Sequence, residues 1–176
     1  MTRAFLGALL LLLAAAASAT TYAHITLEEL AARADVVVRA RVGDGEARWL
    51  ERAGPARIVT FHRVDVLEVL QGRLTDAEGA ERSLTVGVPG GVVGEIGQRV
   101  HGAPKLASGD VVVIFLGPAT GPGGARGVVG LEQGVLHVIG GRLTPHEGEG
   151  GGLPGVVPPP PTVDALKARL WPRERR

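Results

Sequence analysis

The chain has 176 residues, no cysteine, and 19 lysine and arginine residues against 18 aspartate and glutamate residues, which is a formal net charge of +1. The absence of cysteine excludes disulfides, thiolate metal sites and cysteine catalysis, so packing must hold the fold together. A nearly neutral chain lacks the broad basic field of nucleic-acid-binding proteins. An aromatic content of 3% also leaves few stacking platforms for single strands.

The first 23 residues have the order of a secretory signal peptide. Arg3 gives a basic start, an apolar run extends from Ala4 to Ala17, and small residues end at Ala19 and Ala23. We expect cleavage after Ala19 or Ala23, export to the periplasm or the extracellular space, and no integral membrane span in the mature chain. A retained anchor is the alternative, although the apolar run is shorter than the ~20 residues that cross a bilayer.

The mature chain begins with a predicted helix and two predicted strands. In "HITLEELAARAD", Thr26 can cap a helix and Glu29 is its capping-box partner. The alternation in "DVVVRARV" predicts a half-buried strand. The long segment "RIVTFHRVDVLEVLQG" is β-branched, and its apolar phase changes between Phe61 and Val64. Such a change predicts a β-bulge, where a long strand bends as in small barrels.

Later segments complete a β-rich domain over residues 24–143. "SLTVGVP" predicts a strand, "GDVVVIFLG" predicts a strand buried on both faces, and "GVVGLEQGVLHVIGG" predicts two short strands around Gln133. We therefore predict a mostly β fold, a closed or nearly closed barrel of five or six strands with a short helix at each end. The predicted core includes Val36, Val38, Phe61, Val86, Val113 and Phe115.

The C-terminal part changes in composition. Residues 144–161 are rich in glycine and proline, which predicts a linker. Residues 162–176 predict a short helix, capped by Thr162, and a basic tail. Two interpretations stay open for this segment: a helix that docks on the domain, and a frayed, solvated tail.

The order of the strands resembles a known family. "RADVVVRARV", "RIVTFHRVDVLEVLQG", "LTVGVP" and "GDVVVIFLG", within Ala34 to Leu131, are similar to the N-terminal domain of the tissue inhibitors of metalloproteinases. That resemblance implies a netrin-like OB-fold, a five-stranded Greek-key barrel, and suggests a protease as partner. The N-terminal cysteine that binds the protease zinc in that family is missing here, and so are the disulfides. No residue of the inhibitory site is therefore carried over.

A glycine-rich loop, "VPGGVVGEIGQRVHGAP" (Val88 to Pro104), joins the third and fourth barrel strands. It lacks the lysine and the hydroxyl residue that follow the glycines of a phosphate-binding loop. Glycine also suits irregular turns, and loops on a rigid barrel often contact partners. Its aliphatic residues either pack over the barrel end or form a contact patch. The candidate partner-binding residues are Trp49, Val92, Val93, Glu95, Ile96 and Arg99.

The histidines do not have the spacing of a metal site. No His-Glu-x-x-His occurs, and His62 and His137 are interpreted as strand-face residues. His146 lies in the predicted linker. If the signal peptide is cleaved after Ala23, the amino and imidazole nitrogens of His24 offer a copper or zinc site as an alternative.

Catalytic patterns are also missing. Ser83 and Ser108 lie outside any Gly-x-Ser-x-Gly motif, and Asp65 and Glu68 lie three residues apart on a strand and so on opposite faces. We therefore predict no enzyme, no cofactor and no metal. The favoured hypothesis is an exported, non-catalytic module that binds a protein partner, with a protease as the candidate. The alternatives are an envelope or extracellular structural domain without a discrete site, and a metal-binding or hydrolytic enzyme.

Overall fold

The computed structural model describes residues 24–51, 55–145 and 159–171. The segment interpreted as a signal peptide lies outside these residues. The strands are β1 (Val36–Leu50), β2 (Arg57–Gln71), β3 (Ser83–Pro89), β4 (Gly91–Val93), β5 (Ile96–Gln98), β6 (Val111–Leu116), β7 (Arg126–Gly127), β8 (Val135–Ile139) and β9 (Arg142–Pro145). The helices are α2 (Leu27–Arg33), α3 (Asp76–Glu81) and α4 (Val163–Leu170), with 3-10 turns η1 (Pro122–Gly124) and η2 (Leu131–Gly134).

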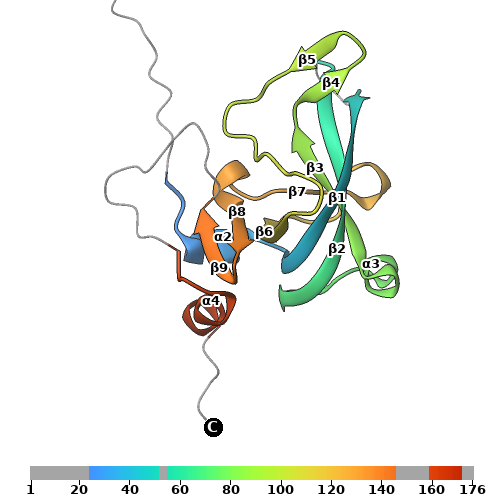
Figure 1. Ribbon diagram of the computed structural model, residues 1–176. Coiled ribbons are helices and arrows are strands. Elements are labelled where there is room, and N and C mark those ends of the chain that lie inside the picture. Colours follow the sequence, from blue (N-terminus) through green and yellow to red (C-terminus); the bar gives the residue numbers. More distant parts are fainter. Residues whose placement is uncertain (1–23, 52–54, 146–158, 172–176) are drawn as a thin grey trace, which may run out of the picture.

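One large sheet organises the described part of the chain (Figure 1). Its strand order is β7-β3-β2-β1-β6-β8-β9, and all neighbours are antiparallel except β3 and β7. The strands β4 and β5 form a separate hairpin. The mostly β class with short helices is confirmed, but the sheet has seven strands rather than five or six and is not closed into a barrel.

The sheet stays open because β7 has only two residues. Beyond it, a single antiparallel bridge joins Val128 to Leu116 at the end of β6. Two backbone hydrogen bonds flank this bridge, from Gly117 N to Gly127 O and from Val129 N to Phe115 O, both 2.9 Å long. The connection between β7 and β6 is therefore a short contact and not a strand ladder.

The β1–β2 pairing is irregular at the predicted place, but there the extra residue lies on β1; two further register shifts, at Val37/Val38 and Arg39/Ala40, put extra residues on β2. Between the pairs Val42–Val64 and Gly45–His62, β1 advances by three residues and β2 by two. The extra residue therefore belongs to β1. Along β2 the phase does not change at this point, because His62 and Val64 are both buried.

Phe61 is the one predicted core residue that the structure places elsewhere. It lies on the opposite face of β2 from His62 and is only half-buried, with the guanidinium of Arg48 5.3 Å from its ring centroid. The sequence pattern failed here because β2 is apolar on both faces over this stretch, which gives the same signal as a change of phase.

Two hydrophobic clusters lie on opposite faces of β1 and β6, as alternation along a strand requires. The inner core comprises Val36, Val38, Ala40, Val42, Val64, Val66, Leu84, Val86, Val88, Val112, Ile114, Leu116 and Val135. The helix-side core comprises Leu30, Ala31, Val37, Val113, Phe115, Leu136, Leu143, Val163 and Leu166. The two clusters together contain the other five predicted core residues, all of them fully buried.

The helices α2 and α4 cover the sheet on the helix-side core (Figure 1). The predicted capping box of α2 is present: Thr26 accepts from Glu29 N, and the Glu29 carboxylate accepts from Thr26 N. On α4, Arg169 pairs with Glu28 of α2 at 2.8 Å, and the Trp171 indole donates to the Gln71 side chain at 2.7 Å. Hence α4 is part of the packed domain.

The helix α3 and the strand β9 are among the elements that were not predicted from the sequence. The helix α3 begins at the cap Thr75 and has a capping box with Glu78, a Thr-x-x-Glu signature that was legible in the sequence. The strand β9 extends to Pro145, two residues into the predicted linker, and the rest of that linker up to residue 158 lies outside the described residues.

Candidate functional site

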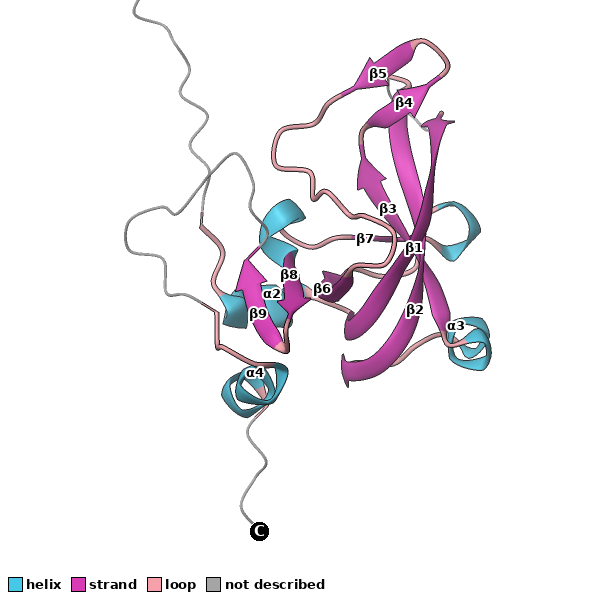
Figure 2. Ribbon diagram, in the orientation of Figure 1, coloured by secondary structure: helices cyan, strands magenta, loops and turns pink. Residues whose placement is uncertain are grey.

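One end of the molecule gathers the candidate residues, and we call it the hairpin end: residues 47–50, 57–60 and 89–106. It contains the far ends of β1 and β2, the β4–β5 hairpin and the segment that follows β5 (Figure 2). The helix α3 lies at the opposite end of the long β1–β2 hairpin (Figure 1). The glycine-rich loop thus contains a small hairpin, where the sequence had indicated only irregular chain.

Two glycines allow this hairpin to lie close against the main sheet. Gly90 and Gly91 have φ values of +99° and +133°, which side chains other than glycine rarely adopt. The N–H of Gly90 donates to Ile58 O and its carbonyl accepts from Thr60 Oγ1, both at 2.8 Å. A Cβ on Gly91 would collide with Thr60 Oγ1 and lie 2.9 Å from the Cβ of Ala47. The glycines therefore serve a turn and a close backbone approach.

Trp49 lies at the same end as the β4–β5 hairpin. It pairs with Ile58 across β1 and β2, and the N–H of Ile58 donates to the Gln98 side chain of β5 at 2.5 Å. Of the candidate residues, Val92 is 67% exposed, Ile96 55% and Trp49 43%. Glu95 and Arg99 are exposed, and Val93 is half-buried. The structure thus brings all six candidates to one end of the molecule and leaves five exposed.

A cleft lies between the hairpin and the end of the sheet. Its volume is about 560 Å³, and its walls come from β2, β3, the β4–β5 hairpin, the segment 99–106 and η2. Part of that segment packs onto the inner core through Ala103 and Leu106. The loop therefore does both things that the sequence left open: its later part covers the sheet end, and its hairpin exposes aliphatic side chains.

His62 is a wall residue of this cleft that the sequence placed only on a strand face. Its side chain points to the same side as the inner core, 8% exposed, and its Nδ1 is buried without a hydrogen-bond partner among the described residues. The ring lies against Gly45, where a Cβ would come within 2.7 Å of Nδ1. An unsatisfied buried polar group typically costs ~1–3 kcal/mol, so the buried Nδ1 of His62 is a destabilising feature of this wall.

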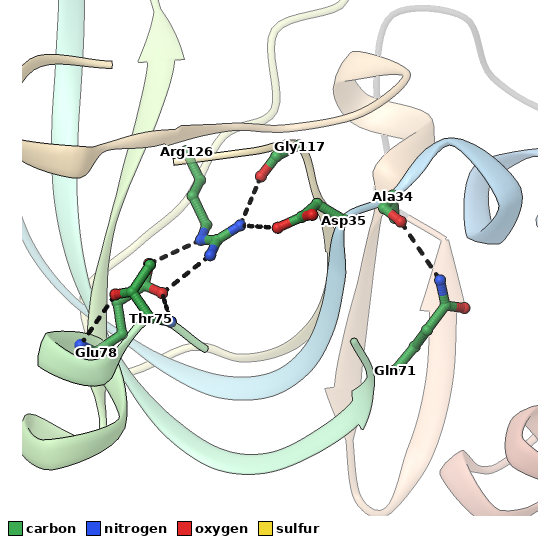
Figure 3. A network of polar contacts seen from close by, with 7 residues as sticks. All are labelled: Ala34, Asp35, Gln71, Thr75, Glu78, Gly117 and Arg126. Atoms are coloured by element: carbon green, nitrogen blue, oxygen red, sulfur yellow. Dashed lines mark hydrogen bonds and ion pairs between the residues drawn. The ribbon is translucent and has the colours of Figure 1, made fainter. Parts of the chain in front are cut away.

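A second polar cluster is centred on Arg126 of β7 (Figure 3). Arg126 is only 2% exposed. Its Nε and Nη2 donate to the two carboxylate oxygens of Glu78 at 2.7 and 3.0 Å. Its Nη1 donates to Asp35 at 2.6 Å and to the carbonyl of Gly117 at 2.9 Å. Arg126 therefore ties the short strand β7 to α3, to the start of β1 and to the end of β6.

The electrostatics of this cluster indicate a structural ion pair. The hydrogen bonds from Arg126 lower the pKa of Glu78, in spite of its burial, and the N–H of Thr75 lowers it further. The hydrogen bond to Glu78 in turn raises the pKa of Arg126. All three guanidinium nitrogens of Arg126 donate to acceptors of the same chain, so the guanidinium offers no open nitrogen to a substrate. Sequence reasoning missed this pair because its members lie 48 residues apart.

The remaining candidates for chemistry are dispersed. Ser83 is buried and donates to Glu81 at 3.2 Å, whereas Ser108 lies exposed in a turn. Glu68 pairs with Lys167 of α4, so it is not grouped with Asp65. In the part of the chain that the structure describes, no three histidine, cysteine or acidic side chains are grouped to hold a metal ion. His24 Nδ1 lies 3.3 Å from the Gln133 side chain.

The same described ranges contain no helix long and apolar enough to cross a membrane. Comparison with protein-family models, with curated proteins and with solved structures found no match to this chain.

Proposed function

We propose that this protein is an exported, non-catalytic binding module that engages a protein partner through the hairpin end. The observation that supports this proposal is the exposure of Trp49, Val92 and Ile96 together at that end. They are three of the six large hydrophobic side chains that are exposed within the described residues. Exposed apolar side chains that gather in one place are typical of protein-contact surfaces.

The hairpin end is also held in one conformation, as a preorganised binding surface is. The glycine pair Gly90–Gly91 and the hydrogen bond from Ile58 to Gln98 hold the β4–β5 hairpin on a rigid sheet. A hairpin held in one position loses little conformational entropy on binding, so more of the contact energy is realised as affinity.

The fold that we propose behind this surface is an OB-like barrel left incompletely closed. The pairings lead from β1 through β2 and β3 to β7, and the bridge between Val128 and Leu116 leads on to β6, which pairs with β1 again. This circular order supports the resemblance to the inhibitor family. A secreted metalloprotease is accordingly the partner class that we would test first, with a contact mode other than zinc binding by an N-terminal cysteine.

A pair of matched double substitutions tests the proposal. Val92→Asp with Ile96→Asp places two charges on the hairpin end, and Leu67→Asp with Val69→Asp places two charges on exposed apolar positions of β2 outside it. Each protein is immobilised and incubated with purified secreted zinc metalloproteases and with culture supernatant. We expect the wild type and the Leu67/Val69 control to retain the same partner and the Val92/Ile96 variant to lose it.

The stability of the variants separates binding from folding. Val92 and Ile96 are more than half exposed, so their substitution leaves the melting temperature within a few degrees of the wild type. Partner capture that survives the hairpin substitutions, or that falls equally in the control, would refute the assigned surface. Absence of any partner would favour the alternative, an extracellular structural domain without a discrete site.

A further inference from the structure

The outer edge of β1 is paired along only part of its length. The strand β6 pairs with it up to Arg41, and the turn before β6 extends this contact to Val42, which donates to Asp110 and accepts from Gly109, both at 2.8 Å. Beyond that point β1 continues past β6 to Leu50 (Figure 1), and among the described residues it pairs there with β2 alone. The last part of β1 therefore has a free strand edge.

The register with β2 shows which backbone groups this edge presents. Ile58 directs both its N–H and its C=O to the far side of β2, where they bond to β5 and to the residue that precedes β4. Its pairing partner Trp49 therefore directs its own N–H and C=O away from β2, because the residues of such an antiparallel pair do not bond to each other. By the same alternation, Ala47 and Gly45 also present their N–H and C=O groups at the free edge.

We propose that two copies of this chain associate through this edge, antiparallel and with Ala47 on the two-fold axis. In that register Ala47 lies opposite Ala47 of the second copy, and Trp49 lies opposite Gly45. Every outward N–H thus meets a C=O of the second copy, and one continuous sheet extends through both molecules. The inference does not rest on the proposed protein partner, because it depends on the backbone edge of β1 and not on Val92 and Ile96.

The charged side chains between these residues fit one register only. Glu46 and Arg48 alternate with the outward residues, and their side chains are 73% and 59% exposed. With Ala47 on the axis, Glu46 of each copy lies opposite Arg48 of the other, and opposite charges in such a position stabilise a strand pair. If the axis moves by one residue, either Glu46 or Arg48 lies opposite itself, which is destabilising. The charge pattern therefore favours a second copy of this chain as the occupant.

The contacts within one copy are compatible with this pairing. Glu46 and Arg48 lie 3.4 Å apart, and the guanidinium of Arg48 lies 5.3 Å from the ring centroid of Phe61. An exposed ion pair of this kind contributes little to stability, and a guanidinium has donors for a second carboxylate. The pairing between copies therefore adds to these contacts and does not require that they break.

The outermost strands of the large sheet are protected in ways that the end of β1 is not. The strand β7 has only two residues, and β9 ends at Pro145 and donates from Leu143 N to the Pro161 carbonyl at 2.9 Å. Short edge strands, prolines and covering segments are devices that prevent edge pairing. Residues 45–49 contain no proline, and no described segment bonds to their outer edge. Edge pairing is therefore expected at this part of β1.

Sedimentation equilibrium of the purified mature protein measures the association. The concentration series should reach about 1 mM, because small interfaces are weak, and we expect a monomer–dimer equilibrium within it. Amide hydrogen exchange at low and high concentration locates the contact. The amides of Gly45, Ala47 and Trp49 should exchange more slowly as the dimer forms, whereas those of Glu46 and Arg48, which point toward β2, should exchange equally at both concentrations.

Charge reversals test the register. Glu46→Arg and Arg48→Glu each place like charges opposite one another, so each variant alone should show a dissociation constant about tenfold higher or more. An equimolar mixture of the two variants restores opposite charges at both positions and should dimerise like the wild type. As controls, Asp65→Arg and Arg63→Glu make the same changes in net charge on an exposed ion pair of β2, which is paired on both edges, and should leave the association unchanged.

Several results would overturn the proposal. A protein that is monomeric at every concentration would exclude the dimer. A dimer that tolerates both single reversals would lie on another surface, and a mixture that fails to recover would exclude the register around Ala47. Protection of the Gly45, Ala47 and Trp49 amides only after another protein is added would assign the edge to a strand of that protein.

Discussion

Arg126→Met removes the guanidinium that ties β7 to the rest of the fold while it keeps a long apolar side chain in the buried position. Four hydrogen bonds disappear: two to Glu78, one to Asp35 and one to the carbonyl of Gly117. The Glu78 side chain, 10% exposed, then carries a charge with no cation beside it.

The expected loss of stability follows from the buried, unpaired charge of Glu78. Removal of one partner of a buried ion pair costs about 3–5 kcal/mol, and the half-exposed Asp35 adds little. A domain of this size has ~5–15 kcal/mol in total. At roughly 3–5 °C per kcal/mol, we expect the melting temperature to fall by about 10–25 °C.

The loss should depend on pH in a defined direction. Because the folded protein lowers the pKa of Glu78 from its ordinary value of 4.5, the ion pair stabilises the fold fully above that value. The stabilisation disappears as the pH falls through the lowered pKa of the folded state. The difference in unfolding free energy between wild type and Arg126→Met is therefore largest at neutral pH and shrinks at pH values below about 4.5.

Urea denaturation at pH 7 and at pH 3, followed by circular dichroism, measures this difference. Adding Glu78→Gln to Arg126→Met keeps an acceptor for the Thr75 N–H and removes the charge, and should recover about half of the loss. As a control, Arg63→Met breaks exposed ion pairs with Asp65 and Glu81 and should cost less than about 1 kcal/mol. A cost below about 1 kcal/mol for Arg126→Met, or a cost that is the same at both pH values, would refute the reasoning.

The remaining predictions concern packing, the glycine turn and processing. Phe115→Ala opens a cavity in the helix-side core and should cost about 3–5 kcal/mol in denaturant unfolding; an unchanged melting temperature would show that this core is wrongly assigned. Leu166→Ala, fully buried on α4, should cost about 2–5 kcal/mol by the same measurement, whereas a cost near zero would mean that α4 does not contribute to the domain. Gly91→Ala should displace the β4–β5 hairpin, visible as shifted amide resonances of Gln98 and Ile58, because its φ is +133° and its Cβ would collide with Thr60. N-terminal sequencing of the exported protein should return Thr20 or His24, and recovery of Met1 would exclude the signal peptide.

Much of the fold could be predicted because its causes are local. The capping box at Thr26 and Glu29, the alternation that begins at Val36 and the apolar run of β6 each specify their element within a few residues. Of the candidate site, the sequence indicated the loop and its exposed aliphatic residues. Helix α3 shows the limit: its Thr75–Glu78 signature was present, but six residues are too few for a helical stripe to be recognised.

The failures have a different origin, since they depend on what faces a residue across the sheet. Phe61 and His62 are neighbours on β2, and the sequence assigned the first to the core and the second to a strand face. Their actual sides follow from unbroken alternation along β2, in phase with the buried Val64. Both faces of β2 carry apolar residues here, so what packs against each face decides which one meets the core, and pattern analysis of the strand cannot detect that.

The sequence by itself determined the strands β1, β2, β3, β6 and β8, the capped helices α2 and α4, the freedom from disulfides and the glycine-rich composition of the loop after β3. These follow from backbone propensity and from the alternation of side chains along a strand, which act over a few residues. Only the tertiary structure decided that Arg126 meets Glu78 and that Gln98 meets Ile58, forty or more residues apart. It also decided that His62 lies in the wall of a cleft. Pairings of such separation leave no local pattern, because long-range strand pairing and packing alone select them.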